Sequence, residues 1–241
     1  FVVSFFFFAI CLKYTTCIRL KSAFFHHFSL DFRLDLLVEN AIIKVMIITY
    51  FGKRFLKLQY GDTVIGINPP TKESPWSKKT STFGADIAIS TSSDPATGGA
   101  DTLSYGDREP FVVDGPGSYE AKGVFITGGF LAEVKGRREN AFSLTLEGMT
   151  IVVLGATDSL SLPNETKELI MHPDILIMPL DGTLLAKDAY KLAMMLEPMI
   201  IVPVDYEDDI LKQFIKEAGA EKPEVMDKLT LKRKDLEGKD G

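Results

Sequence analysis

Short apolar runs separated by glycine and turn residues follow one another from residue 46 to residue 154. Several of these runs alternate apolar with polar positions, which is typical of half-buried β-strands, and others are continuous apolar stretches of strand length. The dipeptide Glu147-Gly148 between the last two runs indicates a tight hairpin turn. The pattern predicts strands at 46–51, 55–59, 63–67, 86–90, 111–113, 123–127, 141–146 and 150–154.

The pattern changes after residue 160, where helical periodicity and buried strands alternate. Pro163 favours the start of a helix, and Gly219 is placed to cap the end of the last one. The spacing of apolar positions predicts helices at 163–171, 186–197 and 207–218 and strands at 174–179 and 199–203. A β-rich half followed by an α/β half indicates two packed sheets flanked by helices.

Residues 1–45 differ in composition from the rest of the chain. They contain nine of the 17 Phe and both cysteines, Cys11 and Cys17, but no Met, Gly or Pro. The apolar run at 1–12 is shorter than the roughly 18 residues that span a bilayer, and no basic region precedes it as in a signal peptide. We therefore expect the folded domain to begin at Met46, with residues 1–45 as upstream read-through or a disordered leader. A membrane-associated leader is the alternative.

Charge and cysteine content narrow the range of partners. The domain is expected to cover residues 46–226, followed by a mixed-charge tail, 227–241, that is loosely ordered. The net charge of −6 and the pI near 5.2 argue against nucleic-acid binding, because a phosphate backbone is usually met by a surplus of Lys and Arg. The absence of cysteine after Met46 excludes a disulfide framework and a thiolate metal site there. These features predict a cytoplasmic protein, with no membrane partner unless residues 1–45 belong to it.

Segments spread over residues 48–206 carry a resemblance to one known family. The most distinctive is DGPGSYE at 114–120, followed by Gly123-Val124. The other matching segments are ITYFGK at 48–53, VIGINP at 64–69, ADIAIS at 85–90, the runs 175–180 and 184–198, and IIVPVDY at 200–206. In this order they resemble the metallo-β-lactamase superfamily, in particular its small branch of Zn-dependent-hydrolase-like proteins. The resemblance implies an α/β fold of the αββα sandwich type, in which helices flank two mixed sheets.

The residues that hold zinc in this family are replaced at the matching positions. The family pattern is H-x-H-x-D-H in one loop, a Gly-Asp after a later strand, and a final His, since imidazole and carboxylate suit Zn²⁺. The first strand also usually ends in a Gly-His turn, which here is Gly52-Lys53. The residues at the ligand positions are Ser92, Asp94, Ala96 and Thr97 in the loop, Ala156 after Gly155, and Asp205 at the end.

Carboxylates, rather than histidine or cysteine, dominate the remaining chemistry of the predicted domain. His172 is its only histidine, so neither a zinc site of the family type nor a Ser-His-Asp or Cys-His arrangement can be built. Asp94 and Asp205, with Asp158 and Asp181 expected near the same strand ends, leave one alternative open. Carboxylates prefer hard cations, so an oxygen-ligated Mg²⁺, Mn²⁺ or Ca²⁺ site stands beside the simpler interpretation of solvated loop aspartates.

We expect a degenerate active-site edge, without an assigned catalytic residue, where the loops 92–97, 155–159 and 204–206 meet. The favoured function is a non-catalytic pseudoenzyme without a cofactor, acting as a binding or assembly module. Its partner would be a protein, a small molecule or a second copy of the chain. The alternative is a hydrolase that uses a carboxylate-bound Mg²⁺ or Mn²⁺ ion. The residues of the degenerate edge are Ser92, Asp94, Ala96, Thr97, Ala156, Asp158 and Asp205.

Overall fold

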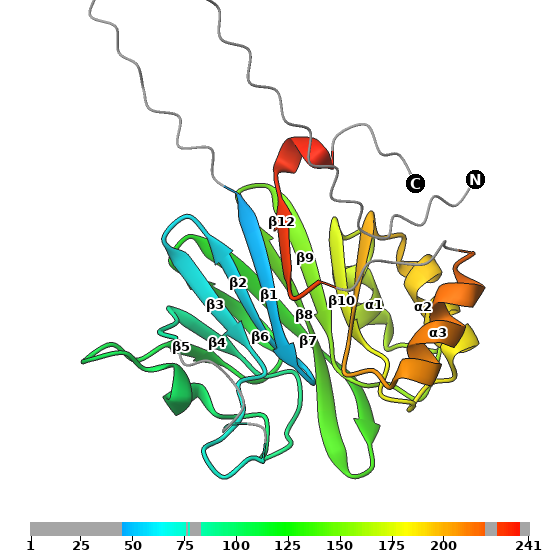
Figure 1. Cartoon of the computed structure of the whole chain (residues 1–241), viewed down its shortest axis with the longest axis horizontal. Coiled ribbons are helices and arrows are strands. Elements are labelled where there is room, and N and C mark those ends of the chain that lie inside the picture. The colour runs from blue at the N-terminus through cyan, green and yellow to red at the C-terminus, as the bar shows by residue number, and fades with distance from the viewer. Residues whose placement is uncertain (1–44, 76, 78–82, 220–225, 237–241) are drawn as a thin grey trace, which may run out of the picture.

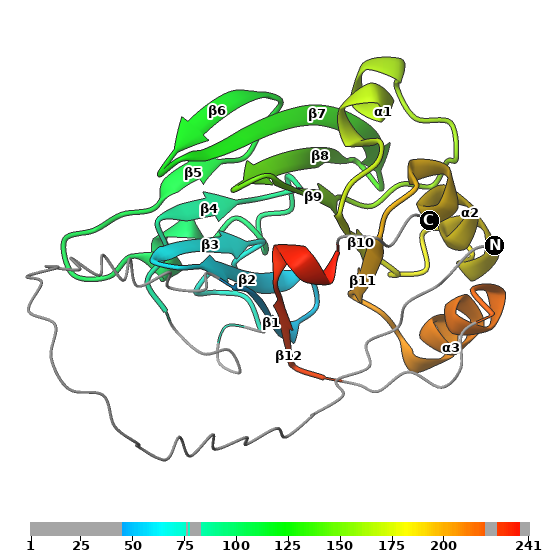
Figure 2. The same cartoon turned by 90° about the horizontal axis from the view of Figure 1, so that it is seen from above.

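Two six-stranded sheets pack face to face (Figure 1, Figure 2). The computed structural model of the chain describes residues 45–75, 77, 83–219 and 226–236. Sheet A consists of β12 (Lys228–Leu231), β1 (Met46–Gly52), β2 (Phe55–Tyr60), β3 (Thr63–Ile67), β4 (Ile87–Ile89) and β5 (Phe111–Val113), in that spatial order. Sheet B consists of β11 (Ile200–Val204), β10 (Ile175–Pro179), β9 (Met149–Leu154), β8 (Arg137–Leu146), β7 (Val124–Val134) and β6 (Gly117–Ala121).

Helices cover the outer face of sheet B (Figure 2). In the described residues these are α1 (Asn164–Ile170), α2 (Ala186–Leu196) and α3 (Asp208–Glu217). Leu192 of α2 and Phe214 of α3 are buried in one cluster with Leu176 of β10. On the outer face of sheet A, Phe55 packs with Leu103 of the short 3₁₀ helix η2 (Ala100–Leu103). Both sheets therefore bury apolar side chains on their outer faces as well as between them.

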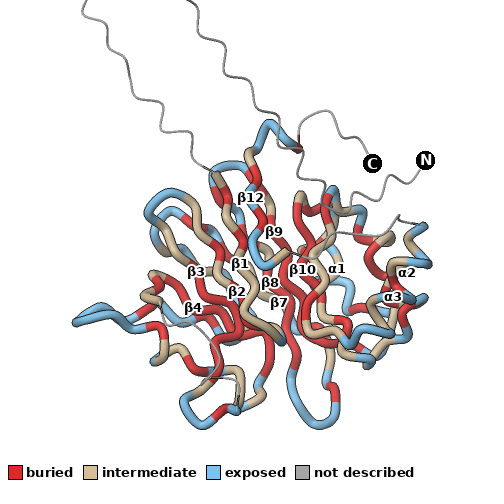
Figure 3. The backbone as a smooth tube through the Cα atoms, viewed as in Figure 1, coloured by how far each residue is buried: buried red, intermediate tan, exposed pale blue. Residues whose placement is uncertain are grey.

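The main core lies between the sheets. Ile65 and Ile67 of β3 and Phe142 and Leu144 of β8 are each at most 1% exposed and belong to one cluster. Residues two apart point to the same face of a strand, so the alternating pattern of the sequence places these side chains inward. The buried backbone segments run along the strands of both sheets in Figure 3.

Both sheets are mixed, and this mixture creates the edge at which the site lies. Strands β3, β4 and β5 are parallel to one another in sheet A, as are β9, β10 and β11 in sheet B, while the other neighbours are antiparallel. Asn68 follows β3 and Asp205 follows β11, and both line one pocket. The carboxyl ends of the two parallel groups thus meet at one edge, which is where ligands bind in sheets of this kind.

The sandwich expected from the resemblance is confirmed, and three local features differ from the prediction. Strand β6 was not predicted, and it pairs with β7. Strands β7 and β8 form a longer hairpin than expected, because their pairing continues through Gly128 and Gly129. The expectation of loose order after residue 227 was wrong for β12, which pairs with β1. Leu229 and Leu231 alternate with polar residues there and are buried in the main core, so this short run has a strand pattern of its own.

Almost all of the expected leader, residues 1–44, lies outside the described residues. Within the part of the chain that the structure describes, no helix is both long enough and apolar enough to cross a membrane.

We predict that a chain starting at Met46 melts within about 2 °C of the full chain, since every residue that the structure places in a core cluster lies at or after Met46. Met46 is the first residue of β1, is fully buried, and pairs with Tyr60 and Leu231. Thermal unfolding followed by circular dichroism checks this. A chain starting at Lys53 is the control, and it should not fold, because β1 joins β2 to β12. Aggregation of the chain that starts at Met46 would refute the predicted domain start.

Candidate functional site

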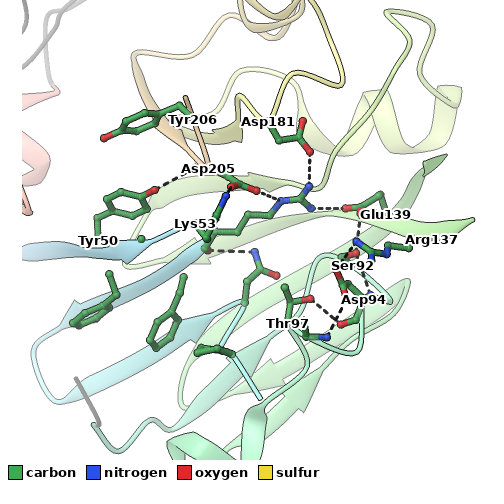
Figure 4. Close-up of a pocket in the computed structure, with 17 residues that line it drawn as sticks. Tyr50, Lys53, Ser92, Asp94, Thr97, Arg137, Glu139, Asp181, Asp205 and Tyr206 are labelled. Carbon is green, nitrogen blue, oxygen red and sulfur yellow. Dashed lines mark hydrogen bonds and ion pairs between the residues drawn. The ribbon is translucent and has the colours of Figure 1, made fainter. Parts of the chain in front are cut away.

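A pocket of about 500 Å³ opens at the edge where the parallel strands end (Figure 4). Its walls come from the β1–β2 hairpin, from the segments that follow β3, β4, β10 and β11, and from the beginning of β8. Each of these segments starts or ends a strand at the same edge, so residues far apart in sequence meet there. Aromatic and charged side chains share the lining, among them Tyr50, Phe51, Phe55, Tyr206, Arg54, Glu139, Asp181 and Asp205.

Arg54, at the tip of the β1–β2 hairpin, is the central cation of the pocket. Its guanidinium donates from Nη1 to Glu139 Oε2 at 2.9 Å, from Nη2 to Asp181 Oδ2 at 2.8 Å, and from Nε to Asp205 Oδ2 at 3.2 Å. The side chain is only 13% exposed. Burial by itself would lower the pKa of Arg54, but the three carboxylates outweigh burial and raise that pKa above its ordinary value. In Figure 4 the carboxylates of Glu139, Asp181 and Asp205 point toward this common centre.

Glu139, the third residue of β8, is a buried carboxylate with every nearby donor directed at it. The residue is 2% exposed. Besides Arg54, the hydroxyl of Ser92 donates to Oε1 at 2.7 Å and the backbone N–H of Ala156 donates to Oε2 at 2.9 Å. A Cβ added at Gly155 would lie 2.6 Å from Oε2, so only glycine admits this close approach. A buried charge needs such pairing, because an unpaired one is costly.

Three non-glycine residues around the pocket have left-handed backbone conformations. They are Lys53 (φ 54°), Asn68 (φ 52°) and Asp205 (φ 50°). The backbone N–H of Asp205 donates to the Lys53 carbonyl at 2.8 Å, and the side chain of Asn68 accepts from the Thr91 N–H at 2.8 Å. The first bond joins the end of β11 in sheet B to the hairpin, and the second joins the ends of β3 and β4 in sheet A. Such conformations are unfavourable for residues with a Cβ and are concentrated at functional sites.

Asp94 is engaged within its own loop and with β8. Its carboxylate forms an ion pair with Arg137 at 2.5 Å and accepts from the backbone N–H of Ala96 at 2.9 Å. The Thr97 hydroxyl donates to the Asp94 carbonyl at 3.0 Å. The loop that carries metal ligands in the family is therefore closed here by its own hydrogen bonds and by one arginine.

Tyr50 lies where the hairpin meets the end of β11. Its ring stacks on that of Tyr206, with centroids 6.1 Å apart, and its hydroxyl accepts from the Asp205 N–H at 3.3 Å. Burial raises the pKa of Tyr50 to about 12, although the Asp205 N–H acts in the opposite direction. The phenol therefore stays neutral over the physiological range.

The structure brings most of the sequence-derived edge residues to one place. Ser92, Asp94, Ala96, Thr97 and Asp205 all line the pocket. Ala156 contacts the same network through its backbone N–H, whereas Asp158 is exposed and is not part of the lining. His172 is two-thirds exposed at the far end of α1, where its Nδ1 lies 3.1 Å from Glu197.

Sequence reasoning missed the two residues at the centre, Arg54 and Glu139. Arg54 follows the Gly52-Lys53 turn and has nothing in its neighbourhood in the sequence that distinguishes it from a surface hairpin residue. Glu139 offers a faint signal, because it lies directly before a predicted strand in the run RRENAFSL, where a charge next to buried positions is unusual. Asp181 was expected near the strand ends, and its carboxylate accepts a hydrogen bond from the Arg54 guanidinium.

The residues present do not fit the zinc ion of the family. Ala96 and Ala156 have no side-chain donor atom, and the Ser92 and Thr97 hydroxyls donate to neighbouring oxygens. The two aspartates at ligand positions both face cations instead. Asp94 pairs with Arg137, and Asp205 pairs with Arg54 and, at 3.2 Å, with Lys53. In the described ranges of the chain, no group of three or more His, Cys, Asp or Glu is arranged to hold a metal ion.

Comparison with known sequences and structures relates this chain to one protein family. A family model described as "Beta-lactamase superfamily domain" matches residues 47–205. A candidate Zn-dependent hydrolase of the metallo-β-lactamase superfamily from Thermotoga maritima is 26% identical, with a TM-score of 0.56 over 70% of this chain and 86% of that chain. A comparison with curated proteins gives no significant match.

Two more distant structures share the fold. A candidate metal-dependent hydrolase from Parabacteroides distasonis is 21% identical, with a TM-score of 0.57 over 73% of this chain and 91% of that chain. Igni18, a metallo hydrolase from Ignicoccus hospitalis, is 16% identical, with a TM-score of 0.55 over 78% of this chain and 99% of that chain. At these identities the likeness concerns the fold alone.

We predict that Glu139→Gln destabilises the protein by about 3 kcal/mol, because removing one partner of a buried ion pair leaves the other charge uncompensated. Asp101→Asn is the matched control, since Asp101 pairs with Lys72 at a similar distance of 2.8 Å but on the open surface. Urea unfolding measures both variants. Equal stability of the two variants would show that Glu139 is not a buried structural charge.

From the raised pKa of Tyr50 we predict that the protein loses stability at high pH. The ordinary pKa of tyrosine is 10.0 and that of Tyr50 is about 12, so the unfolded chain ionises first. The resulting stabilisation is complete below pH 10 and is lost as the pH rises through 12. The free energy of unfolding, measured with urea between these pH values, should therefore fall less steeply with pH for Tyr50→Phe than for the unchanged protein. Tyr105→Phe, at a position that is 76% exposed, is the control, and a Tyr50→Phe slope like that of the control would contradict the assignment.

Proposed function

Because this chain belongs to the β-lactamase superfamily domain family, we propose that it is a non-catalytic member that binds a small molecule in the pocket at the sandwich edge. The observation that carries the proposal is the guanidinium of Arg54, which lies among the carboxylates of Glu139, Asp181 and Asp205. A fixed side-chain cation occupies the place where these acids converge. It cannot provide the open coordination position that metal-assisted hydrolysis requires.

The loss of catalysis is supported by the state of each group that a hydrolase would need. Metal-activated water requires ligands that leave one position free, and here Asp94 and Asp205 are already neutralised by side-chain cations. Nucleophilic catalysis requires a hydroxyl next to a base. The hydroxyl of Ser92 does donate to a carboxylate, that of Glu139, but this carboxylate is buried and its charge is already compensated by Arg54 and the Ala156 N–H. Neither arrangement generates a nucleophile.

Binding is supported by the pocket itself. A volume of about 500 Å³ is in the range of small-molecule sites. The combination of aromatic side chains such as Tyr206 with half-exposed cations, Lys53 and Arg137, suits a ligand with an apolar body and a polar group. The left-handed conformations of Lys53, Asn68 and Asp205 are held around this pocket by specific hydrogen bonds. We place the protein in the cytoplasm as part of the same proposal.

We predict that the purified protein binds neither Zn²⁺, Mn²⁺ nor Mg²⁺ stoichiometrically and does not hydrolyse phosphoester or lactone substrates. Isothermal titration measures the metals, and product release measures hydrolysis. The double variant Asp94→Ala and Asp205→Ala is the control for a carboxylate site. Micromolar binding by the unchanged protein that disappears in this variant would favour the alternative, a hydrolase with a carboxylate-bound cation.

The binding role has its own test. A fragment library screened by ligand-observed NMR should give hits that compete with one another for the pocket. Ala96→Trp adds a bulky ring to the lining and should abolish these hits, whereas Leu185→Trp, at an exposed position outside the lining, should not. Hits that persist in Ala96→Trp, or a complete lack of hits, would count against a small-molecule site.

A further inference from the structure

Three carboxylates from three separate segments converge on one guanidinium. Glu139 comes from β8, Asp181 follows β10, and Asp205 follows β11, while Arg54 comes from the opposite sheet. Each carboxylate binds a different nitrogen of Arg54, at 2.8 to 3.2 Å. None of the four side chains is more than 23% exposed, so water screens their charges only partly.

Such a group of acids needs a cation. Carboxylates that share a poorly solvated site repel one another strongly when all are ionised. A guanidinium is permanently charged and presents its donors in a planar fork, so it can serve several carboxylates at once. Lys53 adds a second positive charge, but only on the solvent side of Asp205, where its side chain is 52% exposed. The inner charge is supplied by Arg54.

We infer that Arg54 is a built-in cation that does the structural work of a bound metal ion at this edge, and that it thereby closes a carboxylate site to divalent cations. The positions around it support this role. Asp205 stands at the family's final ligand position, and Glu139 binds Ser92 and Ala156, which stand at two others. Arg54 thus compensates the charge of carboxylates at the strand ends that a metal ion joins in the family.

Removing the guanidinium should open the site to hard cations. The remaining donors are all carboxylate oxygens, which suit Ca²⁺, Mg²⁺ and Mn²⁺ rather than Zn²⁺. Each oxygen approaches a different guanidinium nitrogen, at 2.8 to 3.2 Å, so the three oxygens surround a planar group and do not lie around one point at the roughly 2.3–2.6 Å of a Ca²⁺–oxygen bond. An ion in this space would therefore keep some of its water, and we expect affinity in the millimolar range. The inference deepens the proposed function and rests on it, because it assumes that the unchanged protein holds no metal.

The test is the thermal unfolding of Arg54→Met in the presence and absence of divalent cations. This variant replaces the arginine by a shorter, uncharged side chain, so it removes the guanidinium from among the carboxylates. We expect it to melt below the unchanged protein without added cation, and to gain about 4 °C with about 10 mM Ca²⁺ or Mn²⁺. The unchanged protein should gain nothing. Arg137→Met is the matched control, since it removes a cation from the same pocket but leaves only one carboxylate, Asp94, unpaired, and it should show no gain.

A second variant shows whether the carboxylates bind the ion. Arg54→Met combined with Glu139→Gln, Asp181→Asn and Asp205→Asn should fold without added cation and ignore Ca²⁺ and Mn²⁺. The inference is overturned if Arg54→Met folds but does not respond to either ion, if it stays unfolded with them, or if the neutral variant responds as strongly. Recovery of a fold by Arg54→Met only when the cation is present supports it. A response of the unchanged protein as large as that of Arg54→Met would overturn the proposed function as well.

Discussion

The ion-pair group centred on Arg54 joins the two sheets at the edge where the pocket lies. Arg54 belongs to a hairpin of sheet A, and all three of its carboxylate partners belong to sheet B. The apolar core between the sheets is not directional, so it holds the layers together without determining how strand ends meet. The charge-assisted hydrogen bonds of Arg54 are directional and determine which strand ends lie together.

The rest of the pocket depends on Glu139, the most buried of these carboxylates. Its Oε1 accepts from the hydroxyl of Ser92, which follows β4. Its Oε2, which pairs with Arg54, also accepts from the N–H of Ala156, which follows β9. One buried charge thus joins these two loops. Within sheet A the uncharged side chain of Asn68 has a similar role. Its hydrogen bonds link the end of β3 to Thr91 and to the backbone of Arg54.

The family comparison separates the architecture of the edge from its chemistry. The chain has the metallo-β-lactamase fold, and the same loops meet at the same edge as the resemblance implies. In our proposal the charge that a metal supplies in related hydrolases comes from a side chain, so the acids stay neutralised while no water is activated. A fold can persist through such an exchange because its core packing does not depend on which cation closes the edge.

The sequence by itself determined most of the strands, the helices and the sandwich, and it showed which residue types stand at the family's ligand positions. These features depend on local periodicity and on residue types at matched positions, both of which can be read along the chain. Even so, β6 and β12 were missed, because each is a short edge strand that forms only when its one neighbour, β7 or β1, lies beside it.

Only the tertiary structure decided which cations meet the carboxylates at this edge. Arg54 and Glu139 are 85 residues apart, and neither has a local pattern that indicates the other. Asp94 and Asp205 line the pocket, but whether they face an ion or an arginine depends on side chains brought in from other segments of the chain. Long-range ion pairs are specified by the meeting of distant segments, which no window of sequence contains.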